Sequence, residues 1–145
     1  MKKLLFTFLA AGIGFQALAQ TELKLSPIPL LFGYVALSVE QQINPSFGID
    51  GDLLLLDGAF GANISGKYYF DPELGIDKFH IGGFLGAYQD AGLGIGFLAG
   101  YKWVSRKNVV FELGLGVGRG FDLDVIGYGK LHVGYRFNKK SAAPK

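Results

Sequence analysis

The sequence contains no cysteine, and this absence excludes several kinds of chemistry at once. Without a thiol the chain forms no disulfide, no thiolate metal site and no lipid-modified cysteine behind a signal sequence. The formal net charge is only +2, and no basic patch stands out except Lys139–Lys140 in the tail, so nothing favours nucleic acid as a partner. After the first twenty residues, no stretch approaches the roughly 18 unbroken apolar residues of a membrane-spanning helix.

Glycine and aromatic residues are abundant instead. The 145 residues, enough for one domain, include 23 glycines, 13 phenylalanines and 7 tyrosines, and half of all residues are hydrophobic. This combination fits neither a disordered chain nor a helical bundle. It is typical of β-strands whose inward positions must be small.

The N-terminal segment has the three parts of a secretory signal. Lys2–Lys3 is positive, Leu4–Phe15 is largely apolar, and Ala17–Ala19 has the small-residue pattern read by signal peptidase. The alternative is a transmembrane anchor, but the apolar run falls short of the roughly 20 residues that a spanning helix needs. Residues 1–19 are therefore predicted to be a signal peptide that is cleaved before Gln20.

The last predicted strand, Val125–Phe137, shows the pattern that organises the whole chain. Strand residues alternate between two faces. Here one parity is apolar and the other polar or small: Leu131, Val133, Tyr135 and Phe137 against Lys130, His132, Gly134 and Arg136. One face of this strand therefore suits hydrocarbon, while the other tolerates charge.

The same alternation predicts eight strands joined by connections that are too short for a crossover helix. The other seven predicted strands are Glu22–Ser26, Tyr34–Gln42, Phe47–Leu55, Ala59–Phe70, Phe79–Gln89, Leu93–Trp103 and Val109–Val117. An even-numbered up-and-down meander closes into a barrel without edges. We therefore predict an all-β protein, an eight-stranded antiparallel transmembrane β-barrel over residues 20–137, followed by a C-terminal tail, residues 138–145.

The charges indicate which face points inward. The polar parity collects five acids, five bases and a histidine: Glu22, Glu40, Asp50, Asp52, Glu112, Lys24, Lys67, Lys102, Lys130, Arg136 and His132. An eight-stranded barrel has an interior just wide enough for side chains, so balanced charges can pair there. On a lipid face, each charge would cost roughly 2–4 kcal/mol at mid-membrane. The apolar parity is therefore predicted to face lipid, around an interior network of charges.

Aromatic residues of the outward parity gather at one end of the predicted barrel. With both termini in the periplasm, the periplasmic strand ends hold Phe47, Tyr68, Phe70, Phe79, Tyr101, Trp103, Phe111, Tyr135 and Phe137. Aromatic rings prefer the level of the membrane interface, so these nine residues are predicted to form a membrane girdle. At the other end only Phe60 is a clear member of a second girdle.

The signal peptide, the eight hairpin strands and the ending Tyr135-Arg136-Phe137 resemble the small OmpA/OmpX-like outer-membrane β-barrel proteins of Gram-negative bacteria. Leu37–Glu40 and Ile43–Ile49 are similar to the second hairpin of uncharacterised members. The resemblance implies a location in the cell outer membrane, and contact with its lipid. It also implies insertion by the outer-membrane assembly machinery, which reads an aromatic-ended last strand. We expect a monomer with a structural, surface-interaction or small-molecule role, and not a wide pore.

Two motifs have plainer explanations than catalysis or ligand binding. Gly92–Gly96 and Gly114–Gly120 repeat glycine with a period of two, which fits inward strand positions better than a nucleotide loop. His80 and His132 take the inward parity, so we expect hydrogen-bonded structural roles for both. No catalytic residue, cofactor or metal ligand is predicted.

Two other classes of function stay open. A secreted soluble barrel could carry an apolar ligand, as lipocalins do, and an outer-membrane enzyme could act on lipid. Asp50 and Asp52 share a face as a catalytic carboxylate pair would, but ion pairing with the inward bases is the plainer interpretation. Any activity is expected at the rim, in Pro27–Gly33, Asp90–Gly92 or Arg119–Asp124.

Overall fold

A computed structural model describes residues 20–89, 92–122 and 124–137. The predicted signal peptide, the C-terminal tail and most of the Asp90–Gly92 turn lie outside these residues. The described elements are β1 (Thr21–Leu25), α2 (Pro27–Leu31), β2 (Val35–Asn44), β3 (Phe47–Leu56), β4 (Ala59–Tyr69), β5 (Lys78–Tyr88), β6 (Gly92–Val104), β7 (Val109–Gly120) and β8 (Val125–Phe137).

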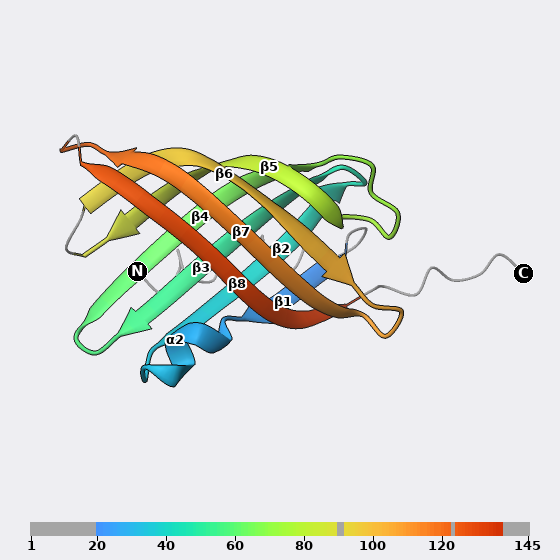
Figure 1. The fold of residues 1–145 in the computed structure, drawn as a ribbon, viewed down its shortest axis with the longest axis horizontal. Coiled ribbons are helices and arrows are strands. Elements are labelled where there is room, and N and C mark those ends of the chain that lie inside the picture. The colour runs from blue at the N-terminus through green and yellow to red at the C-terminus, as the bar shows by residue number, and fades with distance from the viewer. Residues whose placement is uncertain (1–19, 90–91, 123, 138–145) are drawn as a thin grey trace, which may run out of the picture.

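The eight strands form a closed barrel in which every strand pairs antiparallel with its neighbours in sequence (Figure 1). The ring closes where β1 meets β8, with Thr21 opposite Phe137 and Leu25 opposite Val133. All connections therefore join adjacent strands, and the predicted all-β, eight-stranded, up-and-down barrel is confirmed.

The barrel has two different ends. At the terminal end, the first residue of β1 lies beside the last residue of β8, together with the turn at residues 45–46, the connection at residues 70–77 and the turn at residues 105–108. At the helix end, α2 lies at the same end of the barrel as the connections from β3 to β4 and from β7 to β8 (Figure 1). The two ends of the interior have different contents.

The first connection contains a helix where the sequence indicated only an irregular link. Proline is favoured at the start of a helix because its φ is preset and its missing N–H would be unpaired there, and Pro27 takes this place in α2. The Phe32 and Tyr34 amides both donate to the Pro29 carbonyl, at 3.0 and 2.9 Å. Tyr34 is thus tied to the helix, and β2 begins one residue later than predicted. Within the described part of the chain, no helix is long and apolar enough to cross a membrane.

The connection from β7 to β8 is shorter than the predicted Arg119–Asp124 loop. Arg119 and Gly120 continue β7, paired with β8 and β6, and the Gly120 amide donates to the Asp124 carbonyl at 2.8 Å. This hydrogen bond extends the ladder, so the connection covers only residues 121–124.

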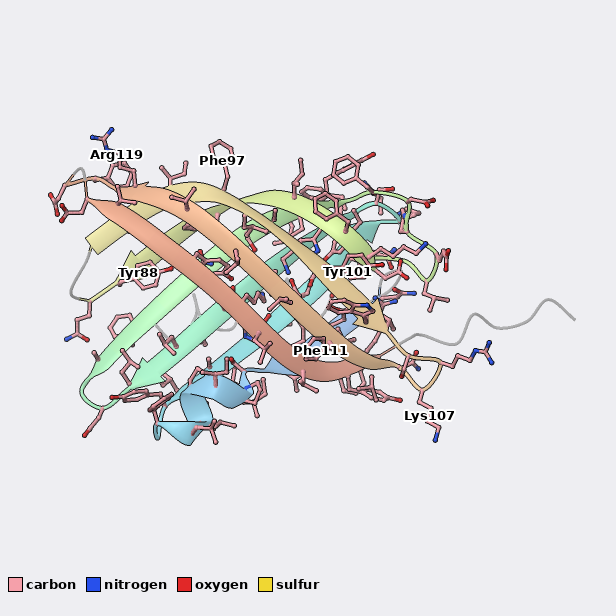
Figure 2. The ribbon with its side chains drawn as sticks, viewed as in Figure 1. Tyr88, Phe97, Tyr101, Lys107, Phe111 and Arg119 are labelled. Carbon is pink, nitrogen blue, oxygen red and sulfur yellow. The ribbon has the colours of Figure 1, made fainter. Side chains whose placement is uncertain are left out.

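Inside and outside follow the predicted parity. Phe97 and Leu115 are 78% and 72% exposed on the outer face, whereas their neighbours Leu98 and Gly114 are buried. In Figure 2 the Phe97 ring points away from the barrel wall. The sequence pattern therefore assigned the two faces of these strands correctly.

The glycine stripes of β6 and β7 make room for an inward aromatic ring from β5. A Cβ at Gly96 would lie 2.7 Å from the Phe84 ring, and one at Gly118 would lie 2.9 Å from it. Such contacts are too close for a side chain, so the close approach of Phe84 requires glycine at both positions. The Gly92–Gly96 and Gly114–Gly120 motifs serve packing here, on strands, as the sequence indicated.

Candidate functional site: the barrel interior

The centre of the interior is a group of three carboxylates that share two lysines. Lys24 Nζ lies 2.6 Å from Glu40 Oε2, 3.1 Å from Asp50 Oδ2 and 2.5 Å from Glu112 Oε2. Lys67 Nζ lies 3.1 Å from Glu40 Oε2 and 2.5 Å from Glu112 Oε1, and it also pairs with Asp50. All five side chains are fully buried, and they come from five different strands, so this centre ties most of the barrel wall together.

Lys102 extends the network toward the terminal end. Its Nζ donates to Glu22 Oε2 at 2.8 Å and to Glu40 Oε2 at 2.6 Å, and it also lies 4.7 Å from the centre of the Tyr69 ring. The Tyr69 hydroxyl donates to Glu40. Glu40 therefore accepts from three lysines and a tyrosine, and Asp50 likewise accepts from three lysines and from the Ser38 hydroxyl.

Lys130 extends the network toward the helix end. Its Nζ pairs with Asp50, and it lies 2.9 Å from Asp52 Oδ1. Asp52 is less buried than the central acids, with its side chain 14% exposed. The two aspartates are therefore linked by a shared lysine, and the ion-pairing interpretation of Asp50 and Asp52 is confirmed.

The predicted network residues thus lie together inside one barrel. The network contains five acids and five bases in contact with one another, so the charges of its members sum to zero. These are Glu22, Glu40, Asp50, Asp52, Glu112, Lys24, Lys67, Lys102, Lys130 and Arg136. A charge-paired interior, predicted from parity alone, is confirmed.

The same three acids resemble a cation site in geometry but not in surroundings. One oxygen each from Glu40, Asp50 and Glu112 lies within 4.8 Å of the others. The ammonium groups of Lys24 and Lys67 already lie among these oxygens. A divalent cation would have to displace two buried lysines, so this group is an ion-pair centre and not a metal centre.

A folded connection closes the terminal end. The segment from Asp71 to Asp77 turns inward, so that Ile76 is fully buried and Asp77 nearly so. Asp77 Oδ1 accepts from the backbone amides of Glu73 and Leu74, at 2.8 and 3.2 Å. The sequence indicated only a polar connection here, because a single buried isoleucine leaves no periodic signal.

Arg136 fixes this connection to the barrel. Its guanidinium donates to Glu22 Oε1 at 2.8 and 2.6 Å, to the Ile76 carbonyl at 2.9 Å and to the Leu74 carbonyl. One arginine on the last strand therefore holds both the network and the segment that closes the terminal end.

The two histidines differ in their partners. His80 Nε2 lies 3.4 Å from Glu112 Oε1, and Nδ1 lies 3.4 Å from the Lys78 carbonyl. His132 has no hydrogen-bond partner on either ring nitrogen, and its closest carboxylate oxygen, on Asp52, is 4.0 Å away. The predicted hydrogen-bonded role is therefore correct for His80 and wrong for His132, because Asp52 is already engaged by other donors.

The helix-end half of the interior contains a cavity of about 440 Å³. Apolar side chains of β3 and β8 form much of its wall, among them Leu54, Leu56 and Ile126, while Asp52 and His132 lie at its polar floor. Pro29 of α2 lines it as well, and Tyr88 lies at this end of the barrel (Figure 2). The interior is therefore filled with paired charges in one half and hollow in the other.

The nine predicted girdle residues all lie at the terminal end, and most are exposed on the outer face. They are Phe47, Tyr68, Phe70, Phe79, Tyr101, Trp103, Phe111, Tyr135 and Phe137. The rings of eight of them pack in three groups, with ring centres 5.1 Å apart for Tyr68–Phe70, 5.7 Å for Phe70–Phe79, 4.5 Å for Tyr101–Trp103, 5.5 Å for Trp103–Phe111 and 5.2 Å for Tyr135–Phe137. The aromatic residues that the sequence placed at one end of the predicted barrel therefore do cluster at one end of its outer face.

The sequence analysis did not assign three inward aromatic side chains, Tyr69, Phe84 and Tyr128, to the barrel interior. Tyr69 is fully buried beside the network, and Phe84 stacks on Tyr128 with ring centres 5.0 Å apart. The Tyr128 hydroxyl donates to Asp52 Oδ2 at 2.7 Å. Parity alone would have identified the two tyrosines, since Tyr69 shares the face of Lys67 and Tyr128 that of Lys130.

Comparisons of the chain with protein-family models, with curated proteins and with solved structures give no match. The class is therefore defined by the geometry: a closed eight-stranded antiparallel barrel with a buried, charge-paired interior.

Proposed function

We propose that the chain is an integral outer-membrane β-barrel protein of the OmpA/OmpX-like kind, exported by the signal peptide at residues 1–19 and inserted by the outer-membrane assembly machinery. Its role is structural or an interaction with small molecules or surfaces, and it is not a wide pore. The observation that carries this proposal is the outer face of the barrel. On the described strands that face is apolar almost from end to end, and its one charged residue, Arg119, lies at the helix-end rim.

The height of the apolar face supports a membrane location. From Leu93 to Trp103, every outward residue of β6 is apolar or a tyrosine or tryptophan. These ten steps rise about 33 Å along the strand, which at a tilt of about 40° is about 25 Å along the barrel axis. Transmembrane barrels have an apolar band of about this height.

The aromatic girdle supports an orientation with the terminal end in the periplasm. Tyr135 and Phe137 end the last strand on its outer face, which is the signal expected by the assembly machinery. The helix end then faces outward, with α2 and the rim turns at the outer surface. Partners of the barrel would be met at this end.

The filled interior supports a role other than free conduction. Eight strands enclose space for little more than side chains, and here the central acids and lysines are in contact across that space. Solutes would have to separate buried ion pairs in order to pass. We propose no catalytic role, since the histidine nearest the central acids, His80, is buried within the network.

A soluble lipocalin-like barrel is the alternative, and the cavity is the observation that favours it. Such a barrel would show a polar outer face to water, whereas exposed apolar patches on soluble proteins rarely exceed a few hundred Å². Here the exposed residues of the strands are mainly Leu, Ile, Val and Phe. The outer-membrane proposal therefore has the stronger support.

Fractionation tests the proposal directly. After carbonate extraction of cell envelopes the protein should stay in the pellet, and unboiled samples should migrate anomalously on SDS gels. Recovery in the soluble periplasmic fraction would refute it.

A pair of lysine substitutions tests the lipid-facing surface. Leu115 and Val125 are both highly exposed, but Leu115 lies within the apolar band and Val125 at its helix-end rim. In a membrane, Leu115→Lys should cost roughly 2–4 kcal/mol of unfolding free energy, and Val125→Lys about 0–1 kcal/mol. Urea titration of the refolded variants in lipid vesicles measures both. Equal, negligible effects would indicate that the outer face meets water.

A further inference from the structure

The helix-end cavity contains polar atoms that the rest of the interior does not satisfy. Asn63 Oδ1 and both ring nitrogens of His132 are buried and lack a hydrogen-bond partner. The two residues are only 8% and 6% exposed, and both line the cavity. Native proteins leave few such groups unpaired, and those that remain often mark function.

The charge at the floor of this cavity is already compensated. Asp52 accepts from Lys130 Nζ at 2.9 Å, from the Tyr128 hydroxyl at 2.7 Å and from Asn63 Nδ2 at 3.4 Å. A charged ligand group would therefore find no free counter-charge among these side chains. A neutral group would not disturb the pairs.

The chemistry of the unpaired atoms narrows the ligand further. A neutral imidazole offers one N–H donor and one acceptor nitrogen, and an amide oxygen offers only an acceptor. A ligand head that donates to the Asn63 oxygen and accepts from the His132 N–H pairs with both residues at once, as a hydroxyl or a primary amide does. A carbonyl alone would leave the Asn63 oxygen unpaired, because a carbonyl cannot donate.

The walls call for an apolar body behind this head. Leu54, Leu56 and Ile126 line the cavity above the polar floor. Its volume of about 440 Å³ lies within the roughly 300–1,000 Å³ of small-molecule sites. Pro29 of α2 also lines the cavity, and the end of this helix exposes two apolar residues, Leu31 and Phe32.

We propose that this cavity binds a neutral amphiphile, with its hydroxyl or amide head between His132 and Asn63 and its apolar chain along Leu54 and Ile126. The site would be specific for an uncharged head and tolerant of the chain. The inference deepens the small-molecule role proposed above. It needs the closed barrel but not the membrane, so its failure would leave the fractionation result unaffected.

The two histidines provide an internal comparison for the test. The full mature chain is refolded into phosphatidylcholine nanodiscs, with a heavy nitrogen isotope in the histidine rings, and is followed by NMR during titration with decanol. His132 signals should shift saturably, while those of His80, held by Glu112 and the Lys78 carbonyl, should not move. Should fractionation find a soluble protein, the same titration is run in buffer.

Three further probes examine the head-group claim at equal mole fraction in the lipid. Decane has no head, decanoate is negative and decyltrimethylammonium is positive. Each of these probes should need at least about a tenfold higher mole fraction than decanol to produce the same shift of the His132 signals. Equal responses to decane and decanol would overturn the role of His132 and Asn63, and equal responses to the charged probes would overturn the neutral-head assignment.

Two alanines provide a matched pair of blocking variants. Ala59 lines the cavity at the rim, whereas Ala87 has the outward parity on β5 and does not line it. Ala59→Trp should abolish the decanol shift, and Ala87→Trp should leave it intact. Asn63→Leu, which removes the amide, should weaken binding by about tenfold. Equal decanol binding by both tryptophan variants would refute the proposal. So would the absence of a His132 shift with every probe, which would mean that only solvent contacts the His132 and Asn63 atoms.

Discussion

The two halves of the barrel interior differ in how completely their polar groups are paired. In the terminal half, Lys24, Glu40 and Glu112 are fully buried and contact oppositely charged partners at 2.5–2.6 Å. In the helix-end half, His132 and Asn63 line a cavity with unpaired atoms. The first half has the organisation of a structural core, and the second that of a binding site, although one set of strands builds both.

This difference follows from side-chain length and placement. Lysines from β1, β4 and β6 cross the interior and meet acids from other strands, so paired side chains occupy the middle of the terminal half. Toward the helix end, β3 contributes Leu54 and Leu56, and β8 contributes Ile126. These side chains neither pair across the axis nor fill it.

The largest expected effect is the loss of a central acid. Glu112→Ala removes the partner of Lys24 and Lys67, at 2.5 Å each, and leaves buried charge uncompensated. Breaking one side of a buried pair costs about 3–5 kcal/mol. We expect the unfolding free energy, measured by urea titration in lipid vesicles, to fall by this amount.

Leu113→Ala is the matched control, because Leu113 adjoins Glu112 in sequence but lies on the outer face. It should lower the unfolding free energy clearly less. Arg136→Ala should resemble Glu112→Ala, since Arg136 pairs with Glu22 at 2.6 Å and holds the closing segment. If Leu113→Ala were as costly as either, the interior would not be the main source of stability.

The next effect concerns assembly and compares aromatic residues at the two ends. Phe137 ends β8 on the outer face at the terminal end, while Phe60 lies on the outer face at the helix end. If the assembly machinery reads the last strand, Phe137→Ala should reduce the amount of folded barrel in the outer membrane several-fold. Phe60→Ala and removal of residues 138–145 should each have less effect.

Quantitative blots of heat-modifiable protein from outer membranes measure all three variants. Equal amounts of folded protein for Phe137→Ala and for the truncated chain would contradict the strand boundary at Phe137.

A smaller effect is expected in the helix-end half. His132→Phe replaces a ring that has two unpaired nitrogens with an apolar ring of similar shape. Removing an unpaired buried polar group is nearly neutral or stabilising, so the unfolding free energy should change by no more than about 1 kcal/mol. The same urea titration, with Glu112→Ala alongside, measures it. A loss of about 3 kcal/mol or more would mean that His132 belongs to the charge network.

The sequence indicated the terminal half well and the helix-end half poorly, for a physical reason. Charges such as Lys67 and Glu112 all share the parity opposite to the apolar residues, so parity was enough to place them inside. Phe84 and Tyr88 are compatible with either face and blurred the pattern of β5. The cavity exists because the side chains around it are too short to fill the space between them. The helix α2 is held by local hydrogen bonds to the Pro29 carbonyl. Neither feature leaves a periodic signal in the sequence.

The smallest expected effect is on conductance, and it separates two possible seals of the barrel. The closing segment, Asp71–Asp77, covers the terminal end with Ile76. The charge network fills the middle of the barrel through Lys24, Lys67 and their acidic partners. If the network is the seal, the wild type should show no steady conductance in planar bilayers. Ile76→Ala, which trims the closing segment and leaves the ion pairs in place, should be equally silent. Eight strands leave little space beyond side chains, so an ion would have to cross the plane of the central pairs in either protein. Steady current from Ile76→Ala alone would identify the closing segment as the seal, and current from the wild type would show that the central charges are hydrated and apart.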